Sequence, residues 1–381
     1  LQTQDSNSSF SSVDNMHAQL TYQDVNNLLQ SDIPLRMAAM FRAGLTLEVV
    51  DSEQPKTQKP VRLTHSDFFT MFNVPVQFGQ PWSEQADEFA HNKVVIGHQL
   101  NQELFGGENS VGQQLIIADR VFDIVAVLAH WQPVPKFYDI TTGAFSHSEQ
   151  LYIPFAHARN NDLNVWYNIW GNVESWNNQN ITSYAQYKAS EVLWLHAWVE
   201  FANEQQRQDF KTFLAAYIEH QQSLGRFQRK DAAFGLKRLM EWLDYRNVVG
   251  EDNYLLIVLS FLFLAVCLVN TLGLMLSKFL RRSPDVGVRR ALGASLSQIF
   301  IQHLVEVGLL GFIGGVLGLA ITQLAIMHLR QYNGEYQLLA QLDLTMLLTA
   351  PVLAISVTLL AGIYPAWVIC RTQPARYLKS Q

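Results

Sequence analysis

Residues 254–276 read YLLIVLSFLFLAVCLVNTLGLML, an apolar run of 23 residues that contains no charged side chain. A helix of about 20 apolar residues crosses the roughly 30 Å hydrocarbon layer of a membrane. Two further apolar runs follow at residues 304–329 and 344–369, and the first of these carries one acidic residue, Glu306, near its start. The sequence therefore predicts three membrane spans and excludes a purely soluble protein.

Basic residues indicate which side of this region faces the cytoplasm, because Lys and Arg are concentrated in the cytoplasmic loops of membrane proteins. The loop after the first run and the tail after the third are basic, whereas residues 331–343 carry no Lys or Arg. We therefore expect the first loop and the tail in the cytoplasm, and residues 1–250 and 331–343 on the outer side. The basic residues are Lys278, Arg281, Arg282, Arg289 and Arg290 in the loop, and Arg371, Arg376 and Lys379 in the tail.

The first 20 residues are rich in Ser, Asn and Gln and are predicted to form a tether. They show neither the basic start nor the apolar core of a signal peptide. A large outer domain must nevertheless be carried across the membrane. We therefore expect an uncleaved helix before Leu1, which would give four spans in all, and a removed signal peptide is the alternative.

Charge and cysteine content restrict the class of the outer domain. Within a chain of 381 residues, the first 250 contain 18 basic and 27 acidic residues, a net charge of −9. This balance argues against a nucleic-acid-binding module, which would show a clustered basic surface. Both cysteines, Cys267 and Cys370, lie in or beside the apolar runs. The outer domain therefore has no disulfide framework and depends on a hydrophobic core.

Short helices and strands alternate in the outer domain from Leu45 onward, which indicates an α+β fold. Residues 98–105 are expected to form a helix that two glycines end. Residues 115–117 and 121–128 are expected to form a hairpin. Strand alternation predicts that four apolar residues of its second strand share one face, namely Phe122, Ile124, Ala126 and Leu128.

The last part of the outer domain is predicted to be helical. Residues 203–222 show apolar residues at helical spacing. Residues 232–253 are expected to form a helical stalk continuous with the first span. Between residues 130 and 200 the chain is rich in aromatic residues, which indicates either packing of a strand-rich subdomain or a surface that binds a partner or an apolar substrate. These are Trp131, Phe137, Tyr138, Trp166, Tyr167, Trp170, Trp176, Trp194 and Trp198.

The basic loop, residues 281–295 (RRSPDVGVRRALGAS), is predicted to contain a short helix over residues 284–293. Ser283 is a favourable N-cap, and Gly293 is a favourable residue to end the helix. Ser295 and Gln298 match a capping box that would begin the next helix. Such a helix would lie against the cytoplasmic face of the membrane. It would present Val286, Val288 and Leu292 beside Arg289 and Arg290.

At this point the sequence resembles the FtsX/MacB-type permeases of ABC transporters. The family pattern [DE]-[IV]-G-[VI]-R-[RK]-A-L-G-A is matched from Asp285 to Ala294. A glycine-rich span that opens with Glu306 follows, and Pro365-Ala366 and Pro374-Ala375-Arg376 match the end of the family pattern. The outer domain is similar to the family's periplasmic core domain at Phe68-Phe69, 94–96, 104–107, 110–112 and 125–127.

The resemblance implies an architecture and a set of site residues. Residues 1–250 would form an α+β periplasmic core domain, and residues 251–381 an FtsX-like permease domain that is an all-α transmembrane bundle. The short loop helix would be the coupling helix that docks on an ATPase subunit. Its residues are Asp285, Val286, Gly287, Val288, Arg289, Arg290, Ala291, Leu292, Gly293 and Ala294.

Four glycines of the second span form two overlapping GxxxG pairs, Gly311/Gly315 and Gly314/Gly318. Small residues at this spacing permit close approach of two helices. The sequence leaves open whether the pairs pack within one subunit or between two subunits. Glu306 lies near the cytoplasmic boundary, where we expect it to reach water.

Motifs for catalysis are absent from the sequence. There is no G-x-x-x-x-G-K-[ST], no H-E-x-x-H and no G-x-S-x-G, and the outer domain has no cysteine nucleophile. We therefore expect a non-enzymatic subunit without a cofactor or metal, whose partner ATPase binds ATP and Mg²⁺.

The expected function is that of a permease subunit of a mechanotransmission-type ABC transporter in a bacterial inner membrane. A second permease, identical or paralogous, would pair with it, and a periplasmic adaptor and an outer-membrane channel would be further partners. Efflux of an amphipathic compound or peptide is the favoured activity. The alternatives are extraction of lipoproteins, control of a cell-wall hydrolase, and a membrane-anchored sensor or binding protein without transport.

Overall fold

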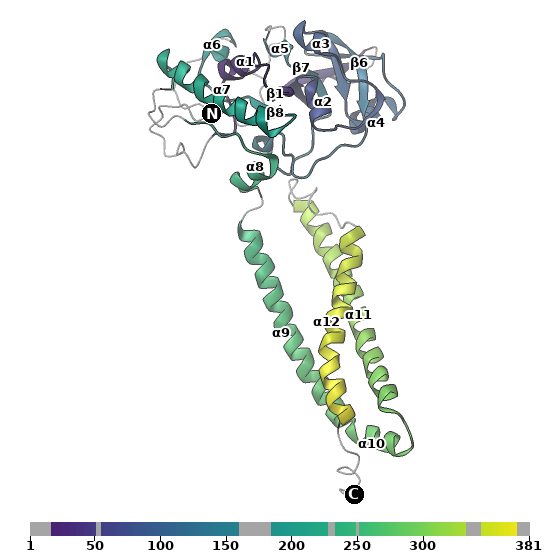
Figure 1. Ribbon diagram of the computed structural model, residues 1–381. Coiled ribbons are helices and arrows are strands. Elements are labelled where there is room, and N and C mark those ends of the chain that lie inside the picture. Colours follow the sequence, from purple (N-terminus) through teal and green to yellow (C-terminus); the bar gives the residue numbers. More distant parts are fainter. Residues whose placement is uncertain are drawn as a thin grey trace. The chain divides into compact units, whose positions relative to one another are not determined.

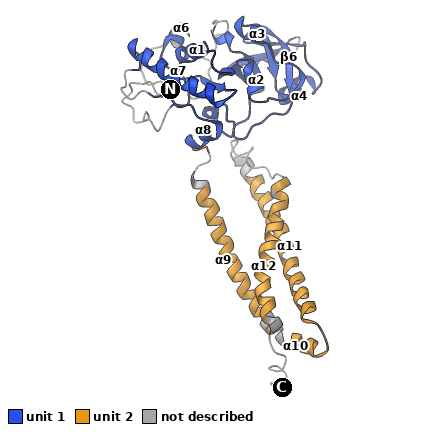
Figure 2. Cartoon of the chain, in the orientation of Figure 1, with its two compact units in different colours: residues 1–245 blue, residues 246–381 orange. Residues whose placement is uncertain are grey.

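The computed structural model describes residues 17–50, 55–159, 184–227, 233–248, 251–332 and 344–371. The chain forms two compact units, an N-terminal unit of residues 1–245 and a helical unit of residues 246–381 (Figure 2). Most of the predicted tether lies outside the described residues, as do most of loop 331–343 and the basic tail beyond Arg371. The same holds for Trp166, Tyr167, Trp170 and Trp176.

The N-terminal unit is a mixed α and β structure in which one sheet joins all the strands (Figure 1). Its strands are β1 (Arg36–Val49), β2 (Thr57–Thr64), β3 (Val76–Gly79), β4 (Lys93–Ile96), β5 (Gln114–Ile117), β6 (Arg120–Leu128), β7 (Leu151–Pro154) and β8 (His196–Glu200). Its helices are α1 (Tyr22–Leu28), α2 (Asp67–Met71), α3 (Glu84–Glu88), α4 (His98–Phe105), α5 (Ala156–Arg159), α6 (Tyr184–Ala189), α7 (Glu204–Ser223) and α8 (Leu239–Tyr245), with a 3₁₀ turn η1 (Ile140–Thr142).

The sheet pairings form a closed circuit that includes the long strand β1. In order, β1 pairs with β2, then β7, β4, β6 and β5 follow, and β5 returns to β1. The β2–β7 and β4–β6 pairs are parallel, and the other pairs of the circuit are antiparallel. Two strands lie outside the circuit: β3 pairs with β6, and β8 pairs with the first part of β1.

Four hydrophobic clusters lie in the described part of this unit, and alternate residues of the strands contribute to the two largest. In β4, Val94 and Ile96 belong to the first cluster, whereas Val95 belongs to the second. Helices α1, α4 and α5 add to the first cluster, and α2 and α3 add to the second. This alternation is the normal consequence of a strand that is buried on both faces.

Strand β6 shows one correction to the sequence prediction. Phe122 and Ile124 lie in the first cluster, as expected for residues that share a face, but Ala126 and Leu128 lie in the second. The register explains this, because Val94 lies opposite Ile124 while the next residue, Val95, lies opposite Ala126. The extra residue is a β-bulge, and a shift of one residue moves every later side chain to the other face.

Local turn signals placed other elements correctly. Helix α4 ends at Phe105, and Gly106 has a φ of +63° in the left-handed region that a glycine adopts without strain. The β5–β6 hairpin has a two-residue loop, Ala118–Asp119, and both residues have positive φ, 48° and 61°. Such a loop follows the right-handed twist of the flanking strands.

The predicted continuous stalk over residues 232–253 is wrong. Residues 234–238 are not helical, and the short helix α8 covers only Leu239–Tyr245. Asn247 then has a φ of +48°, which is incompatible with a continuing right-handed helix. The next helix begins at Glu251.

The helical unit contains α9 (Glu251–Arg281), α10 (Ser283–Ala291), α11 (Leu296–Tyr332) and α12 (Leu344–Arg371). Within the described residues, three segments are long and apolar enough to cross a membrane, namely Tyr254–Lys278, Leu296–His328 and Leu347–Val368. Their mean hydropathies are 2.7, 2.2 and 2.0. Many of their apolar side chains are exposed, as expected of helices whose surroundings are lipid.

Candidate functional site

Helix α10 connects the first two spans, and the sequence determines where it begins. A single residue, Arg282, separates it from α9 and occupies the N-cap position. Ser283, which the sequence placed at the N-cap, is instead the first helical residue. Asp285 lies in the first turn and Arg289 and Arg290 lie in the last turn, so the charges complement the helix dipole at both ends.

The end of α10 follows the sequence prediction closely. Gly293 has a φ of +102°, and the amide of Ala294 donates to the carbonyl of Arg289 at 3.0 Å. The predicted capping box is formed in both directions. Gln298 N–H donates to Ser295 Oγ, and Ser295 N–H donates to Gln298 Oε1, each at 3.2 Å. This turn fixes the direction in which α11 leaves α10.

The inner face of α10 is anchored by Val286. Its side chain is buried and packs with Met275 of α9 and with Ile299 and Val307 of α11. The expectation that Val286 lies on the presented surface is therefore wrong. Along a helix, residues 286 and 288 point about 200° apart, so the two valines cannot share one face.

The outer face of α10 consists of exposed residues at helical spacing. We define this face as Asp285, Val288, Arg289, Ala291 and Leu292. Leu292 is 83% exposed and Val288 is 53% exposed, and the guanidinium of Arg289 lies beside them, donating to Gln302 Oε1 at 3.3 Å. Exposed apolar residues with a flanking cation are typical of a protein-docking surface. Gly287, Arg290 and Ala294 are half-buried, and Gly293 is exposed in the turn.

An ion cluster around Glu306 ties the same region together. Glu306 Oε1 accepts from Lys278 Nζ at 2.6 Å and lies 3.5 Å from Arg282 Nη1. His303 Nδ1 lies 3.8 Å from Glu306 Oε2. Glu306 thus links α11 to the end of α9 and to Arg282, the residue that caps α10, while 30% of its side chain stays exposed.

The two glycine pairs of α11 have different surroundings. A Cβ added at Gly311 would overlap Thr358 Oγ1, and one added at Gly315 would lie 3.2 Å from Pro351 Cα, so both glycines permit close packing of α11 on α12. A Cβ added at Gly314 or Gly318 would meet no atom within 4 Å among the described residues. Gly311 and Gly315 therefore pack within the chain, whereas Gly314 and Gly318 do not.

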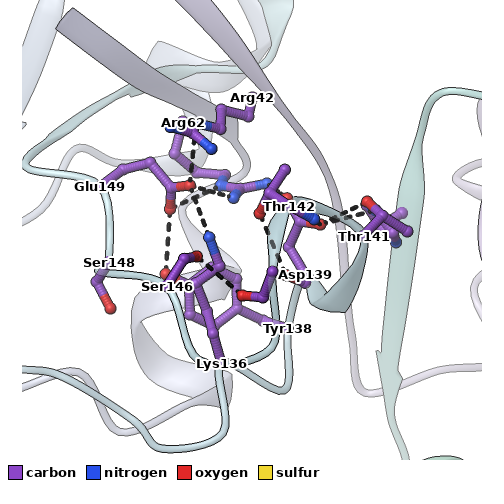
Figure 3. A network of polar contacts seen from close by, with 12 residues as sticks. Arg42, Arg62, Lys136, Tyr138, Asp139, Thr141, Thr142, Ser146, Ser148 and Glu149 are labelled. Atoms are coloured by element: carbon purple, nitrogen blue, oxygen red, sulfur yellow. Dashed lines mark hydrogen bonds and ion pairs between the residues drawn. The ribbon is translucent and has the colours of Figure 1, made fainter. Parts of the chain in front are cut away.

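The N-terminal unit contains a buried ion network that the sequence did not reveal (Figure 3). Arg62 of β2 forms ion pairs with Asp139 at 2.7 Å and with Glu149 at 2.6 Å. Lys136 Nζ lies 3.3 Å from Glu149 Oε1, and the Tyr138 hydroxyl donates to Glu149 Oε2 at 3.1 Å. All five side chains are almost fully buried. The network joins β2 to the loop before β7.

A second branch of the network reaches β8 through Asp139. His196 Nε2 lies 3.2 Å from Asp139 Oδ1, and the Thr141 hydroxyl donates to the same oxygen at 2.8 Å. The carboxylate of Asp139 therefore connects the buried Arg62 to β8, one of the two strands outside the closed circuit. No local pattern signals this arrangement, because its members are far apart in the sequence.

Burial and the neighbouring charges shift the pKa values of these groups in opposite directions. Burial opposes ionisation of Glu149, but Arg62 and Lys136 outweigh it and lower the pKa of this carboxyl to about 2. Burial also opposes ionisation of Asp139, yet Arg62 and His196 hold its pKa well below the ordinary value. Burial lowers the pKa of Lys136, and the nearby charge of Glu149 only partly compensates. Both carboxylates are thus charged near neutral pH.

Comparison with known families matches both units. The family model described as MacB-like periplasmic core domain matches residues 2–185, and the one described as FtsX-like permease C-terminal matches residues 257–374. The chain belongs to the FtsX/MacB-type permease family. The buried pairs that Arg62 forms lie within the first match, and α10 with its anchoring residues lies within the second.

Curated relatives of this permease include ATP-binding/permease proteins. The macrolide export ATP-binding/permease protein MacB of Syntrophobacter fumaroxidans is 22% identical over 384 residues, which cover 93% of this chain and 52% of the relative. The pyoverdine export ATP-binding/permease protein PvdT of Pseudomonas aeruginosa is 24% identical over 324 residues, which cover 83% of this chain and 42% of the relative. The chain thus spans about half the length of the curated relatives it matches.

Among solved structures, the periplasmic region of MacB from Actinobacillus actinomycetemcomitans covers 56% of the permease chain and 82% of its own, at 14% identity and a TM-score of 0.36. Within the described residues of the permease, no group of three or more His, Cys, Asp or Glu side chains is placed to hold a metal ion.

Proposed function

We propose that this chain is the permease subunit of an ABC transporter and that the outer face of α10 docks on a partner ATPase, which binds ATP and Mg²⁺. The exposure of Leu292 on that face is the observation that carries the proposal. An exposed leucine beside cationic side chains is suited to be an interface anchor that a partner covers, since buried apolar anchors contribute most of the binding energy of protein interfaces.

The connections of α10 support a mechanical role. Val286 packs against both α9 and α11, and Glu306 joins the same two helices through Lys278 and Arg282. A displacement of α10 by a closing ATPase would therefore move two spans together rather than bend a loose loop. α9 follows the N-terminal unit in the chain, so such a movement has a covalent route to that unit.

We further propose export as the activity, most simply of an amphipathic compound or peptide. The support is that the curated relatives are named as export proteins, of macrolides and of pyoverdine. In this proposal the chain is non-catalytic and pairs with a second permease copy or a paralogue in a bacterial inner membrane. A periplasmic adaptor and an outer-membrane channel complete the assembly. Lipoprotein extraction and a non-transporting sensor are the competing activities.

Affinity purification of the full-length protein in mild detergent, followed by mass spectrometry, tests the proposal. Recovery of a protein with a Walker motif supports the permease function. A co-purifying adaptor then favours export, and a co-purifying lipoprotein favours extraction. If the protein stays folded and dimeric but brings down no ATPase, the transport proposal is rejected in favour of the sensor.

A further inference from the structure

Strand β8 has one paired edge and one open edge. The register pairs Ala38 of β1 with Trp198 and Ala39 with Ala197. The amide of Ala39 donates to His65 Nδ1 and that of Met37 donates to Asp67 Oδ2, so both point away from β8. Trp198 therefore exchanges backbone hydrogen bonds with β1. Ala197 and Val199, one residue to either side, direct their N–H and C=O groups to the other edge.

The open edge already accepts a partner at its beginning. Leu20 N–H donates to the Leu195 carbonyl at 2.7 Å, and Leu195 N–H donates back at 3.2 Å. Leu195 is two residues before Ala197, so its outward groups confirm which residues face this edge. Beyond it, no hydrogen bond within the described ranges reaches the outward groups of Ala197 or Val199. These groups form a template for an additional strand.

Two adjacent hollows follow the open edge. The first has a volume of about 170 Å³ and is lined by residues 196–199, and the second has a volume of about 530 Å³ and is lined by residues 198–201. Phe137, Trp198, Val199, Leu236 and Lys237 line both. The remaining wall of the first hollow is largely apolar and includes Tyr138, Phe210, Leu214, Phe234 and Trp242. The remaining wall of the second combines the apolar Met71, Phe72, Phe201 and Leu239 with the polar or charged Asn73, Glu200, Asn203, Glu204, Arg207 and Arg238. Together the two hollows lie along residues 196–201, six consecutive residues that span roughly 20 Å in a strand.

The charged residues of the hollows favour an occupant that carries a negative group. Apart from Lys237, which lines both hollows, the charged residues of the larger hollow are paired. Glu200 binds Arg36 at 2.8 Å, and Glu204 binds both Arg207 and Arg238 at 3.0 Å. Among the described residues that line the smaller hollow, Lys237 is the only Lys, Arg, Asp or Glu, and its Nζ lies 4.1 Å from the centroid of the Tyr245 ring. None of the ion pairs among the described residues involves Lys237, whereas the neighbouring Arg238 pairs with Glu204 at 3.0 Å. A carboxylate would complement it, and a basic group would be repelled.

We propose that the open edge of β8 binds an extended segment of a partner polypeptide, which adds a strand to the sheet. The partner's backbone pairs with Ala197 and Val199. Its apolar side chains enter the aromatic walls, and an acidic residue or terminal carboxylate lies near Lys237. A small apolar molecule could fill the hollows but could not satisfy a repeating row of backbone donors and acceptors. The inference concerns the N-terminal unit alone and is independent of ATPase docking.

The experiment uses the full-length protein in detergent and a phage-displayed library of random octapeptides, from which the strongest binder is synthesised with a fluorescent label. Two N-methylated versions of this peptide, methylated at odd or at even positions, remove alternate backbone donors. Binding is measured by fluorescence anisotropy. We expect one N-methylated version to bind at least roughly tenfold more weakly than the parent, because it loses the donors that face β8.

A protein variant tests the same edge. Val199→Pro removes an N–H that points outward and leaves the pairing of Trp198 and Glu200 with β1 intact, since proline is tolerated at an edge of this kind. Val199→Ala is the matched control, because it shortens the side chain but keeps the N–H. We expect Val199→Pro to weaken peptide binding roughly tenfold and Val199→Ala to change it little.

Hydrogen exchange resolved to single amides distinguishes backbone pairing from binding through side chains alone, because side-chain contacts would not protect these amides. The amides of Ala197 and Val199 should exchange fast in the free protein and slowly with the peptide bound. The proposal is overturned if no library member binds, or if both N-methylated peptides bind as well as the parent. It is also overturned if these two amides are already protected in the free protein, because another segment or a second copy would then occupy the edge.

Discussion

Replacing Glu149 by Gln removes the carboxylate shared by two buried cations. Arg62 and Lys136 are both fully buried, and each lies within ion-pair distance of Glu149. Asp139 remains and pairs with Arg62, but Lys136 loses its closest negative charge. The variant therefore buries one positive charge in excess, and the N-terminal unit should lose stability.

The magnitude follows from two independent arguments. A carboxyl group whose pKa falls from 4.5 to about 2 on folding contributes on the order of 3 kcal/mol at neutral pH. Breaking a buried ion pair by removal of one partner costs about 3–5 kcal/mol. In a unit of this size, about 3 kcal/mol lowers the midpoint of thermal unfolding by about 6–12 °C.

Thermal unfolding of the full-length protein in detergent, followed by Trp fluorescence, measures this loss. All tryptophans except Trp367 lie in the N-terminal unit, so the signal reports on that unit. Glu103→Gln is the matched control, because Glu103 pairs with Lys59 at 3.3 Å on the surface. Such an exposed pair contributes at most about 1 kcal/mol. Equal midpoints for the two variants would refute the reasoning about the buried network.

Three further predictions concern pH, helix packing and docking. Because the pKa of Glu149 is lowered on folding, its contribution to stability is present above about pH 4.5 and is lost toward pH 2. The unfolding midpoints of the wild type and E149Q should therefore converge as the pH falls through this range. A constant difference between the two midpoints would contradict this. Gly311→Leu should lower the unfolding midpoint of the helical unit, whereas Gly314→Leu should leave it within error, as measured by far-UV circular dichroism; equal effects would contradict the packing described for the two glycines. Charge reversal at both Arg289 and Arg290 should reduce co-purification of the ATPase while membrane insertion stays normal, and unchanged recovery and turnover would exclude a docking role for these arginines.

Local signals in the sequence predicted the elements that depend on neighbouring residues. The capping box of Ser295 and Gln298, the end of α10 before Gly293 and the end of α4 at Gly106 all follow from short-range hydrogen bonding or from a backbone conformation that favours glycine. The three apolar helices follow from composition alone.

Features that depend on distant residues could not be predicted in this way. The sequence around Val286 is compatible with an exposed position on the helix. Val286 is nevertheless buried, because it packs against Met275 and Val307 of the neighbouring helices. The bulge in β6 arises from its pairing with β4, which a single strand does not encode. Arg62 alternates in β2 like a solvent-facing residue, and a loop far along the chain supplies the carboxylates that allow its burial.

Photo-crosslinking from position 292 tests the central claim most directly. Benzoylphenylalanine replaces Leu292 on the outer face of α10, and in the matched control it replaces Gly273 of α9, where an added Cβ meets no atom of the described chain within 4 Å. After irradiation of intact cells, we predict a covalent adduct of position 292 with a protein that carries a Walker motif, and no such adduct of position 273. Folded, membrane-inserted protein that yields no ATPase adduct at position 292 would contradict the account.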